Sequence, residues 1–222
     1  MTIPHSIDEL QRLYEKRFSG QRAYRNRVWR VLVDEYFSRW LPTGARVLDL
    51  GCGYCEFINH VQAKERFGMD LNPTAGTHAA PGVQVLAQDC SQAWQLPANS
   101  LDVVFTSNFF EHLPTKAALR ETLLESWRCL RPGGRLIALG PNVRYLAGAY
   151  WDFYDHHLAL TERSLGEVMT ETGFTLEEQI PRFLPYTMSQ GGQPPIWMLR
   201  AYLKLRFAWP LFGKQFLVVA RK

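Results

Sequence analysis

Apolar residues recur along the 222-residue chain at two different spacings. In residues 6–40 they return every three or four positions, the period of an amphipathic helix, and Ser19 with Gly20 is expected to divide this stretch into two helices. Short continuous apolar runs follow, which are typical of strands buried on both faces. The strands expected from these runs are residues 47–50, 67–70, 83–86, 101–106, 135–139, 174–180 and 216–220.

Helical patterns lie between these runs. One begins near residue 54, a second follows Thr115 as its N-cap, and a third covers residues 161–172, where Gly173 ends it. Strands that alternate with helices predict an α/β fold built on a parallel, doubly wound sheet. Residues 181–213 are rich in proline and aromatic residues, so they break the alternation and are expected to form an insertion between the last two strands.

Composition adds one important feature, the distribution of charge. Hydrophobic residues make up 46% of the chain, which excludes a disordered protein, and four cysteines in this length do not suggest a disulfide framework. The formal net charge is only +4. Residues 1–46 hold nine basic and five acidic residues, residues 47–178 hold nine and 16, and residues 179–222 hold seven basic residues and no acidic one. Two basic ends around an acidic middle indicate an anionic partner.

A glycine-rich turn carries the most specific chemistry. The first buried strand runs into Gly51–Gly53, where a ligand can approach the backbone closely. Asp49 lies inside that strand. Asp70 ends the next strand, 17 residues after the turn, where a carboxylate can accept both hydroxyls of a ribose. Asp89 follows the third strand, where it could bind an amino group of adenine. The pattern predicts a nucleotide-like ligand.

The chain resembles class I S-adenosylmethionine-dependent methyltransferases, closest to the group that contains ubiquinone and small-molecule methyltransferases. The resemblance covers roughly residues 40–180 and rests on five motifs in the family's order: VLDLGCGYCEF, GMDLNP, LAQDC, DVVFTSNFFEHL and LRPGGRLIALGPN. It implies a Rossmann-like sheet of seven strands with an antiparallel last strand. The cofactor would be S-adenosylmethionine, leaving S-adenosylhomocysteine as product.

The resemblance also implies a division of one domain. Residues 1–40 would be a helical N-terminal cap, residues 41–180 the cofactor-binding core, residues 181–213 a substrate cap and residues 214–222 the last strand. Within the core, the implied cofactor contacts are Asp49, Gly51, Cys52, Gly53, Asp70, Leu71, Asp89, Cys90 and Asn108.

Individual roles follow from the same resemblance. Asp49 would order the turn and contact the amino-acid moiety of the cofactor, and Asp70 would bind its ribose. Asp89, with Cys90, would border the adenine. Asn108, next to Ser107, would supply backbone contacts at the methionine end, while the two glycines of the turn would pack beneath the cofactor.

One position departs from the family pattern, because Cys55 stands where the family usually has a third glycine. A residue with a β-carbon is expected to take an ordinary backbone conformation there and to shift the cofactor slightly. Cys52 and Cys55 also form a C-x-x-C pair, for which a metal or redox role is a weaker alternative. An NAD-dependent dehydrogenase is a further alternative, but its fingerprint needs a glycine where this chain has Glu56.

Methyl transfer to a hydroxyl requires alignment of the two reacting groups and a base for the proton. His112, after the fourth strand, is one candidate, and a structural role in its loop is the alternative. His156 is the second candidate, within the aromatic segment 145–157; His157, its neighbour, shares the candidacy and the structural alternative. The Asp-x-x-Asp-His-His pattern that ends this segment could also bind a metal, but no metal is included in the expected site.

The basic ends are expected to build the substrate side. Residues 195–209 predict an amphipathic helix in which Arg200 and Lys204 share a face; it would form a lid, or contact an anionic membrane or a lipid phosphate. Residues 24–27 would cover the cofactor, with one arginine on its carboxylate, or form a solvated helix face. The acidic middle opposes nucleic-acid binding.

These features predict a methyltransferase acting on a small-molecule or lipid-linked acceptor, with a sugar or glycan precursor as one candidate. The alternative is a non-catalytic subunit that keeps the fold and docks a membrane or a protein through its basic aromatic end. Residues 1–17 lack the apolar core of a signal peptide, and no run is long enough to span a bilayer. A cytoplasmic protein is expected, with peripheral membrane contact as an option and the oligomeric state left open.

Overall fold

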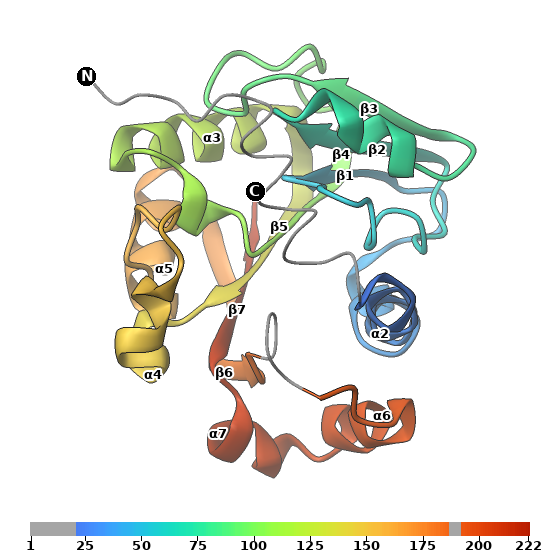
Figure 1. Cartoon of the computed structure of the whole chain (residues 1–222). Helices are drawn as coiled ribbons and strands as arrows, with labels where there is room; N and C mark the ends of the chain where they lie inside the picture. Colours follow the sequence, from blue (N-terminus) through green and yellow to red (C-terminus); the bar gives the residue numbers. More distant parts are fainter. Residues whose placement is uncertain (1–20, 187–191) are drawn as a thin grey trace.

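The computed structural model describes residues 21–186 and 192–222. Their centre is a seven-stranded sheet in the order β3-β2-β1-β4-β5-β7-β6 (Figure 1). Strands β1 to β5 pair in parallel, and β7 runs antiparallel to both β5 and β6. The strands are β1 (Arg46–Leu50), β2 (Glu65–Asp70), β3 (Val83–Ala87), β4 (Leu101–Ser107), β5 (Leu130–Pro141), β6 (Thr175–Leu184) and β7 (Gln215–Arg221). The predicted Rossmann-like sheet with an antiparallel last strand is confirmed.

Helices precede the first strand and lie between later strands. The α-helices are α2 (Arg22–Glu35), α3 (Lys116–Cys129), α4 (Val143–Leu146), α5 (Glu162–Glu171), α6 (Ile196–Lys204) and α7 (Trp209–Phe212). Short 3₁₀ helices are η2 (Phe37–Trp40), η3 (Pro73–His78), η4 (Phe110–His112), η5 (Ala147–Asp152) and η6 (Arg206–Ala208). The predicted N-cap Thr115 is confirmed, and Thr161 also caps its helix, because the hydroxyl of each accepts a hydrogen bond from the backbone N–H of the third residue beyond it. The helix expected before residue 20 lies outside the described residues.

The sheet is covered on both faces, as a doubly wound fold requires. Alternate residues of β7 show this: Val218 packs into one apolar layer, whereas Leu217 and Val219 pack into the other. Helices α3 and α5 cover the first face, and α2 lies on the opposite side (Figure 1). Because both layers are buried, the carboxyl ends of the parallel strands remain as the edge where a ligand can bind.

Two predicted helices are wrong in extent. A helix was expected to begin near residue 54, but residues 53–60 form consecutive turns, because Cys55 takes a left-handed conformation that a helix does not tolerate. The helix expected over residues 195–209 ends at Lys204, where Leu205 leaves helical geometry, and the chain continues through η6 into α7. Strand β6 extends to Leu184, so the insertion begins later than residue 181.

Among the described residues, the longest helices have 14 residues, and none is long and apolar enough to cross a membrane.

Candidate functional site

The turn after β1 is held by backbone hydrogen bonds to the neighbouring strand. The backbone N–H groups of Gly51 and Cys52 donate to the carbonyl oxygen of Met69, at 2.8 and 3.1 Å. Gly51 has φ +71°, and a β-carbon there would lie 2.3 Å from the ring of Phe109. Both the backbone conformation and the close approach of Phe109 therefore require glycine at this position.

Cys55 corrects the expectation of an ordinary backbone at the family's third glycine. Its φ is +57°, in the left-handed region that glycine favours. The residue is fully buried, with its Sγ 3.6 Å from the carbonyl oxygen of Ala75 and 3.8 Å from Sγ of Cys52. Packing and these contacts therefore maintain at Cys55 a backbone shape that glycine adopts without strain.

Asp70 ties the end of β2 to the same turn. Its two carboxylate oxygens accept hydrogen bonds from the backbone N–H groups of Gly53, at 2.8 Å, and Asn72, at 2.9 Å. Burial raises the pKa of this carboxyl above its ordinary value, although the backbone donors oppose the shift. The position predicted for ribose binding thus also shapes the glycine-rich turn.

One cavity of about 640 Å³ opens beside the turn. It brings together seven of the predicted site residues: Asp49, Gly51, Cys52, Gly53, Asn108, His112 and His156. Asp70, Leu71, Asp89 and Cys90 lie outside its wall. Leu71 and Asp89 are exposed, whereas Cys90 is buried in the core, where its Sγ lies 3.5 Å from the hydroxyl of Thr122.

Asp49 is a buried acid in the wall of this cavity, with 4% of its surface exposed. Burial raises its pKa to about 8, the backbone N–H of Ile58 opposes this shift, and the carboxylates of Asp70 and Glu56 add to it. At neutral pH the side chain is therefore mostly protonated. A ligand that brings a positive charge beside it would favour the ionised form.

Asn108 offers a hydrogen-bond acceptor at the same wall. Its φ is +49°, its backbone N–H donates to Leu139 at 2.9 Å, and its amide nitrogen donates to the hydroxyl of Ser107 at 2.9 Å. The buried side-chain oxygen has no hydrogen-bond partner within the described parts of the chain. A buried acceptor without a partner is costly, so the site is suited to a ligand that carries an N–H group.

A cluster of three polar residues faces the cavity from two elements, Glu111 and His112 on η4 and His156 after η5. The rings of the two histidines are 4.9 Å apart, and Nε2 of His112 lies 3.9 Å from a carboxylate oxygen of Glu111. On its other side, Nδ1 of His112 is 3.0 Å from the carbonyl oxygen of Asp155 and 3.3 Å from its carboxylate. Asp155 therefore orients the ring and leaves Nε2 toward Glu111.

The pKa values of Glu111 and His112 in this cluster are both raised from their ordinary values. Burial raises the pKa of Glu111 to about 7, although His112 opposes the shift. Burial alone would lower the pKa of His112, but the hydrogen bond to Asp155 and the charge of Glu111 outweigh it and raise the pKa above its usual value. Two groups whose pKa values are raised by their surroundings therefore stand side by side in a cavity, which is a frequent feature of catalytic sites.

The sequence singled out a different set of residues for a metal. The candidate ligand atoms of Glu111, His112 and His156 lie within 4.8 Å of one another, a spacing that one divalent cation could span. Of the Asp-x-x-Asp-His-His pattern, only His156 belongs to this group. His157, its neighbour, is exposed and does not line the cavity.

Helix α2 and the C-terminal insertion form the roof of the cavity. Arg25 of α2 pairs with Glu56 of the turn, with Nε 3.0 Å from both carboxylate oxygens, and Tyr24 donates to the carbonyl oxygen of Pro194 at 2.9 Å. Of the two arginines in the segment expected to cover the cofactor, Arg25 thus contacts the protein's own turn. Much of the remaining wall is apolar and was not predicted residue by residue: Val28, Trp29, Leu32, Phe153, Tyr186, Trp197, Met198, Leu199, Leu205 and Phe212.

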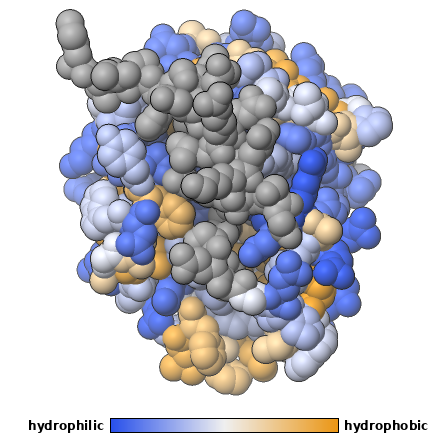
Figure 2. All heavy atoms as spheres, in the orientation of Figure 1, coloured by the Kyte–Doolittle hydropathy of each residue, from blue (hydrophilic) through white to orange (hydrophobic). Residues whose placement is uncertain are grey.

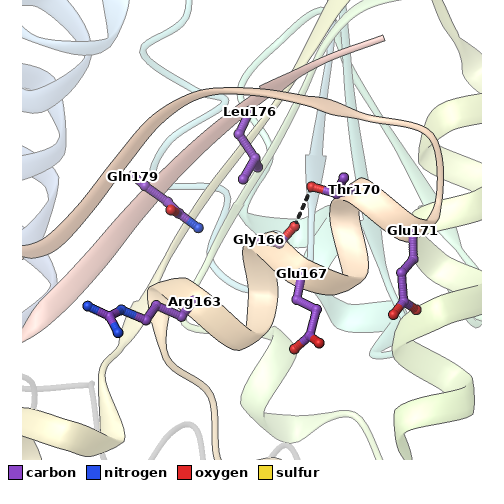
Figure 3. A pocket seen from close by; sticks show the side chains of 7 residues that line it. All are labelled: Arg163, Gly166, Glu167, Thr170, Glu171, Leu176 and Gln179. Atoms are coloured by element: carbon purple, nitrogen blue, oxygen red, sulfur yellow. Dashed lines mark hydrogen bonds between the residues drawn. The ribbon is translucent and has the colours of Figure 1, made fainter.

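A second hollow, of about 470 Å³, lies between α5 and β6 (Figure 3). Gln179 and Leu176 of β6 point toward Gly166, while the charged side chains of Glu167 and Glu171 point outward from the helix. A β-carbon at Gly166 would lie 2.0 Å from the amide nitrogen of Gln179, so that side chain already occupies the space above the glycine. No predicted site residue lies here, and the candidate site is the larger cavity.

Comparisons with known proteins identify the family of the chain. A family model described as a methyltransferase domain matches residues 21–179. Among curated proteins, 2-methyl-6-phytyl-1,4-hydroquinone methyltransferase of Synechocystis sp. is 33% identical over 113 residues, 47% of this chain and 34% of that protein. The match thus spans about a third of the relative's length.

Two solved structures show the same fold. A SAM-dependent methyltransferase from Archaeoglobus fulgidus matches with a TM-score of 0.66 at 20% identity, over 92% of this chain and 99% of that one. A chain from the complex between the Haloferax volcanii Trm112 methyltransferase activator and a methyltransferase matches with a TM-score of 0.70 at 17% identity, over 99% of both chains. Because the family model covers most of its length and its fold agrees, the chain belongs to the methyltransferase domain family.

Proposed function

We propose that the protein is a cytoplasmic S-adenosylmethionine-dependent methyltransferase whose acceptor is a small or lipid-linked molecule with a hydroxyl group and an apolar part. One observation carries the proposal. A single cavity is bordered by the glycine-rich turn with Asp49 and Asn108, by the Glu111–His112–His156 cluster, and by the apolar side chains of the C-terminal insertion.

The cofactor end of this cavity fits S-adenosylmethionine. Asp49 and the unpartnered oxygen of Asn108 suit the ammonium group of the amino-acid moiety, and Asp70 at the end of β2 suits the ribose. Asp89 and Cys90, which follow β3, stay proposed for the adenine end. When bound, the cofactor supplies a methyl group on a sulfonium, so the protein need not activate the electrophile.

The protein's own contribution is alignment, exclusion of water and removal of a proton. The insertion and α2 cover the cavity with apolar side chains, which keep water from the reacting groups. Nε2 of His112 or the ring of His156 accepts the hydroxyl proton, and Glu111 stabilises the resulting imidazolium beside it. Asp155 holds His112 in the orientation that this transfer needs.

The acceptor is inferred from the apolar wall and from the relative. The Synechocystis enzyme is named for a phytyl hydroquinone, a molecule with hydroxyl groups and a long hydrocarbon chain. The apolar side chains at the mouth of the cavity suit a molecule of this general chemistry. A sugar or glycan precursor on a lipid carrier also combines hydroxyl groups with a hydrocarbon chain. An experiment therefore has to distinguish a quinol from a lipid-linked glycan as the acceptor.

Two measurements test the proposal. Titration calorimetry with S-adenosylmethionine and S-adenosylhomocysteine should show binding in the micromolar range or tighter, and its absence would refute the enzyme. Transfer of a labelled methyl group into fractionated cell extract should then label the lipid or small-molecule fraction. Glycosidase or mild acid treatment releases a water-soluble labelled sugar from a glycan on a lipid carrier but leaves a labelled quinol in the lipid phase. Label only in RNA or protein would overturn the proposed acceptor.

A non-catalytic subunit is the second candidate. It is favoured by the exposed apolar side chains of the insertion, which could dock a partner, and by the fold shared with a chain from an activator complex. If the protein is a non-catalytic subunit, it should fold stably and can still bind the cofactor, but no fraction of the extract should become labelled. The cavity's polar cluster distinguishes the two, because a docking subunit does not need Glu111, His112 and His156.

A further inference from the structure

We propose that the end of the molecule formed by α6, η6 and α7 docks on an anionic phospholipid bilayer, with the mouth of the cavity facing the lipid. We call this end, Ile196–Phe212, the docking segment. The inference adds a membrane partner to the proposed function. It does not depend on catalysis, because binding to vesicles can be measured on the cofactor-free protein.

The first observation is a concentration of exposed apolar side chains. Of the 11 large apolar residues exposed among the described parts of the chain, six lie within 16 consecutive positions of the docking segment. Between 45 and 72% of the surface of each is exposed; they are Trp197, Met198, Leu205, Phe207, Leu211 and Phe212. Figure 2 shows hydrophobic residues gathered at this end of the molecule, near α7. A patch of this kind on a folded protein marks an interaction surface.

The second observation is that the segment is firmly anchored on its inner side. Leu203 and Trp209 are buried, the hydroxyl of Tyr202 donates to the carbonyl oxygen of Phe183 at 2.7 Å, and the indole N–H of Trp209 donates to the carbonyl oxygen of Tyr202 at 3.0 Å. The exposed side chains are therefore presented by a packed element. Their exposure does not come from a lack of local structure.

The third observation is charge. Lys204 and Arg206 are exposed between the apolar residues, and residues 179–222 contain no acidic residue. Arg200 is already paired, with its Nε 2.6 Å from the carboxylate of Glu35 on α2. Apolar side chains flanked by exposed basic ones match the surface of an anionic bilayer, where the apolar side chains enter the acyl boundary and the basic ones meet phosphates.

The fourth observation connects this surface with the active cavity. Four of the six exposed residues, Trp197, Met198, Leu205 and Phe212, also line the cavity. An apolar acceptor that leaves the bilayer at this point would pass along apolar side chains without crossing water. This continuity favours a lipid over a protein partner, since a protein on the same face would close the mouth.

The experiment compares sedimentation with two kinds of vesicle, phosphatidylcholine alone and phosphatidylcholine mixed with phosphatidylglycerol. The wild-type protein should bind the anionic vesicles, bind the neutral ones more weakly, and dissociate at high salt because salt screens exposed charges. Lys204→Glu/Arg206→Glu should weaken binding to anionic vesicles by at least about 30-fold, from the usual contribution of two basic residues. Phe207→Ser/Leu211→Ser should weaken binding to both kinds; neither residue lines the cavity.

Matched controls come from α3, where Leu124 and Lys116 are exposed on a different part of the surface. Leu124→Ser and Lys116→Glu should bind vesicles like the wild type. All variants should keep the wild-type melting temperature and the same affinity for S-adenosylmethionine, which separates docking from the proposed activity. The proposal fails if the wild type binds neither vesicle or if the controls lose as much binding. It also fails if light scattering finds a dimer that Phe207→Ser/Leu211→Ser dissociates, which would assign the face to a second copy.

Discussion

The turn after β1 and the docking segment border the same cavity, but they are built by different physics. The turn is made of backbone groups and buried acids: Gly51 at φ +71°, two N–H groups on Met69, and Asp70 on Gly53. The docking segment contributes apolar side chains from a nine-residue helix and two short ones. The turn accepts few residue types at each position, whereas the docking segment can exchange one apolar residue for another and keep its apolar character. The difference separates what binds a fixed cofactor from what selects an acceptor.

The largest expected effect tests how little the turn tolerates. Gly51→Val places a branched side chain at a positive φ against Phe109, so we expect a loss of about 3 kcal/mol or more in unfolding free energy and no detectable cofactor binding. Denaturant unfolding and calorimetry measure the two effects. Gly148→Ala is the control, because its φ is not positive and nothing lies within 4 Å of a β-carbon there. Equal tolerance at the two glycines would contradict the assignment.

The polar cluster is the next test. His112→Ala or His156→Ala, whichever removes the base, should lower turnover by about 100-fold or more while S-adenosylmethionine binding is unchanged. His157→Ala is the neighbouring control and should remain active. Full activity of both variants would exclude these histidines as the base.

Dialysis against a chelator belongs with this experiment, because the same cluster could hold a divalent cation. A base needs no metal, so activity should survive. Loss of activity that Mn²⁺ or Zn²⁺ restores would make the histidines metal ligands.

Asp49 sharpens the comparison through pH. Its folded pKa of about 8 lies above the ordinary value of 3.8, so the folded protein binds more protons than the unfolded chain between about pH 4 and pH 8, and the stability falls as pH rises through this window. Asp49→Asn removes this effect. The unfolding free energy of the variant relative to the wild type should rise by up to about 1.4 kcal/mol for each pH unit between pH 5 and pH 8, whereas the variant should bind S-adenosylmethionine poorly. Thermal unfolding at both pH values measures this difference. Asp89→Asn, at an exposed aspartate, is the control and should not show it.

The smallest effect concerns the pH profile of the reaction. A histidine base must be neutral, so kcat/KM should rise with pH through a pKa above the ordinary 6.5 of histidine and then level off. Asp155 raises this pKa, and Asp155→Asn should therefore move the rise to lower pH. A rise that does not move would leave Asp155 without a role in orienting His112.

The same contrast explains what the sequence could predict. The strands and the turn were predictable because few residues satisfy a buried strand or a positive φ, and Asp49 and Gly51 occupy positions defined by that geometry. The prediction at Cys55 was wrong, because its left-handed backbone is maintained by burial and by a contact with Ala75, 20 residues along the chain, which the local sequence pattern does not show. The helix expected around it was wrong for the same reason.

For the part of the cavity proposed to bind the acceptor, the sequence predicted only the general character of the surface. The aromatic and basic character of residues 195–209 is visible in the sequence, but the break at Leu205 and the pairing of Arg200 with Glu35 depend on tertiary contacts. Likewise, the sequence indicated His112 and His156 separately. Their meeting beside Glu111 depends on the packing of η4 against the segment after η5, where the backbone N–H of His157 donates to the carbonyl oxygen of Glu111 at 2.8 Å.

The reactivity of the buried cysteines reports whether the protein is folded. All four thiols of the chain are free and buried, and burial raises the pKa of Cys90 and Cys129. A thiol reagent reacts with the thiolate, so it should modify the folded protein very slowly and all four cysteines once the chain opens. The rate of labelling thus distinguishes a variant that has lost a ligand from one that has lost its fold, with no added probe.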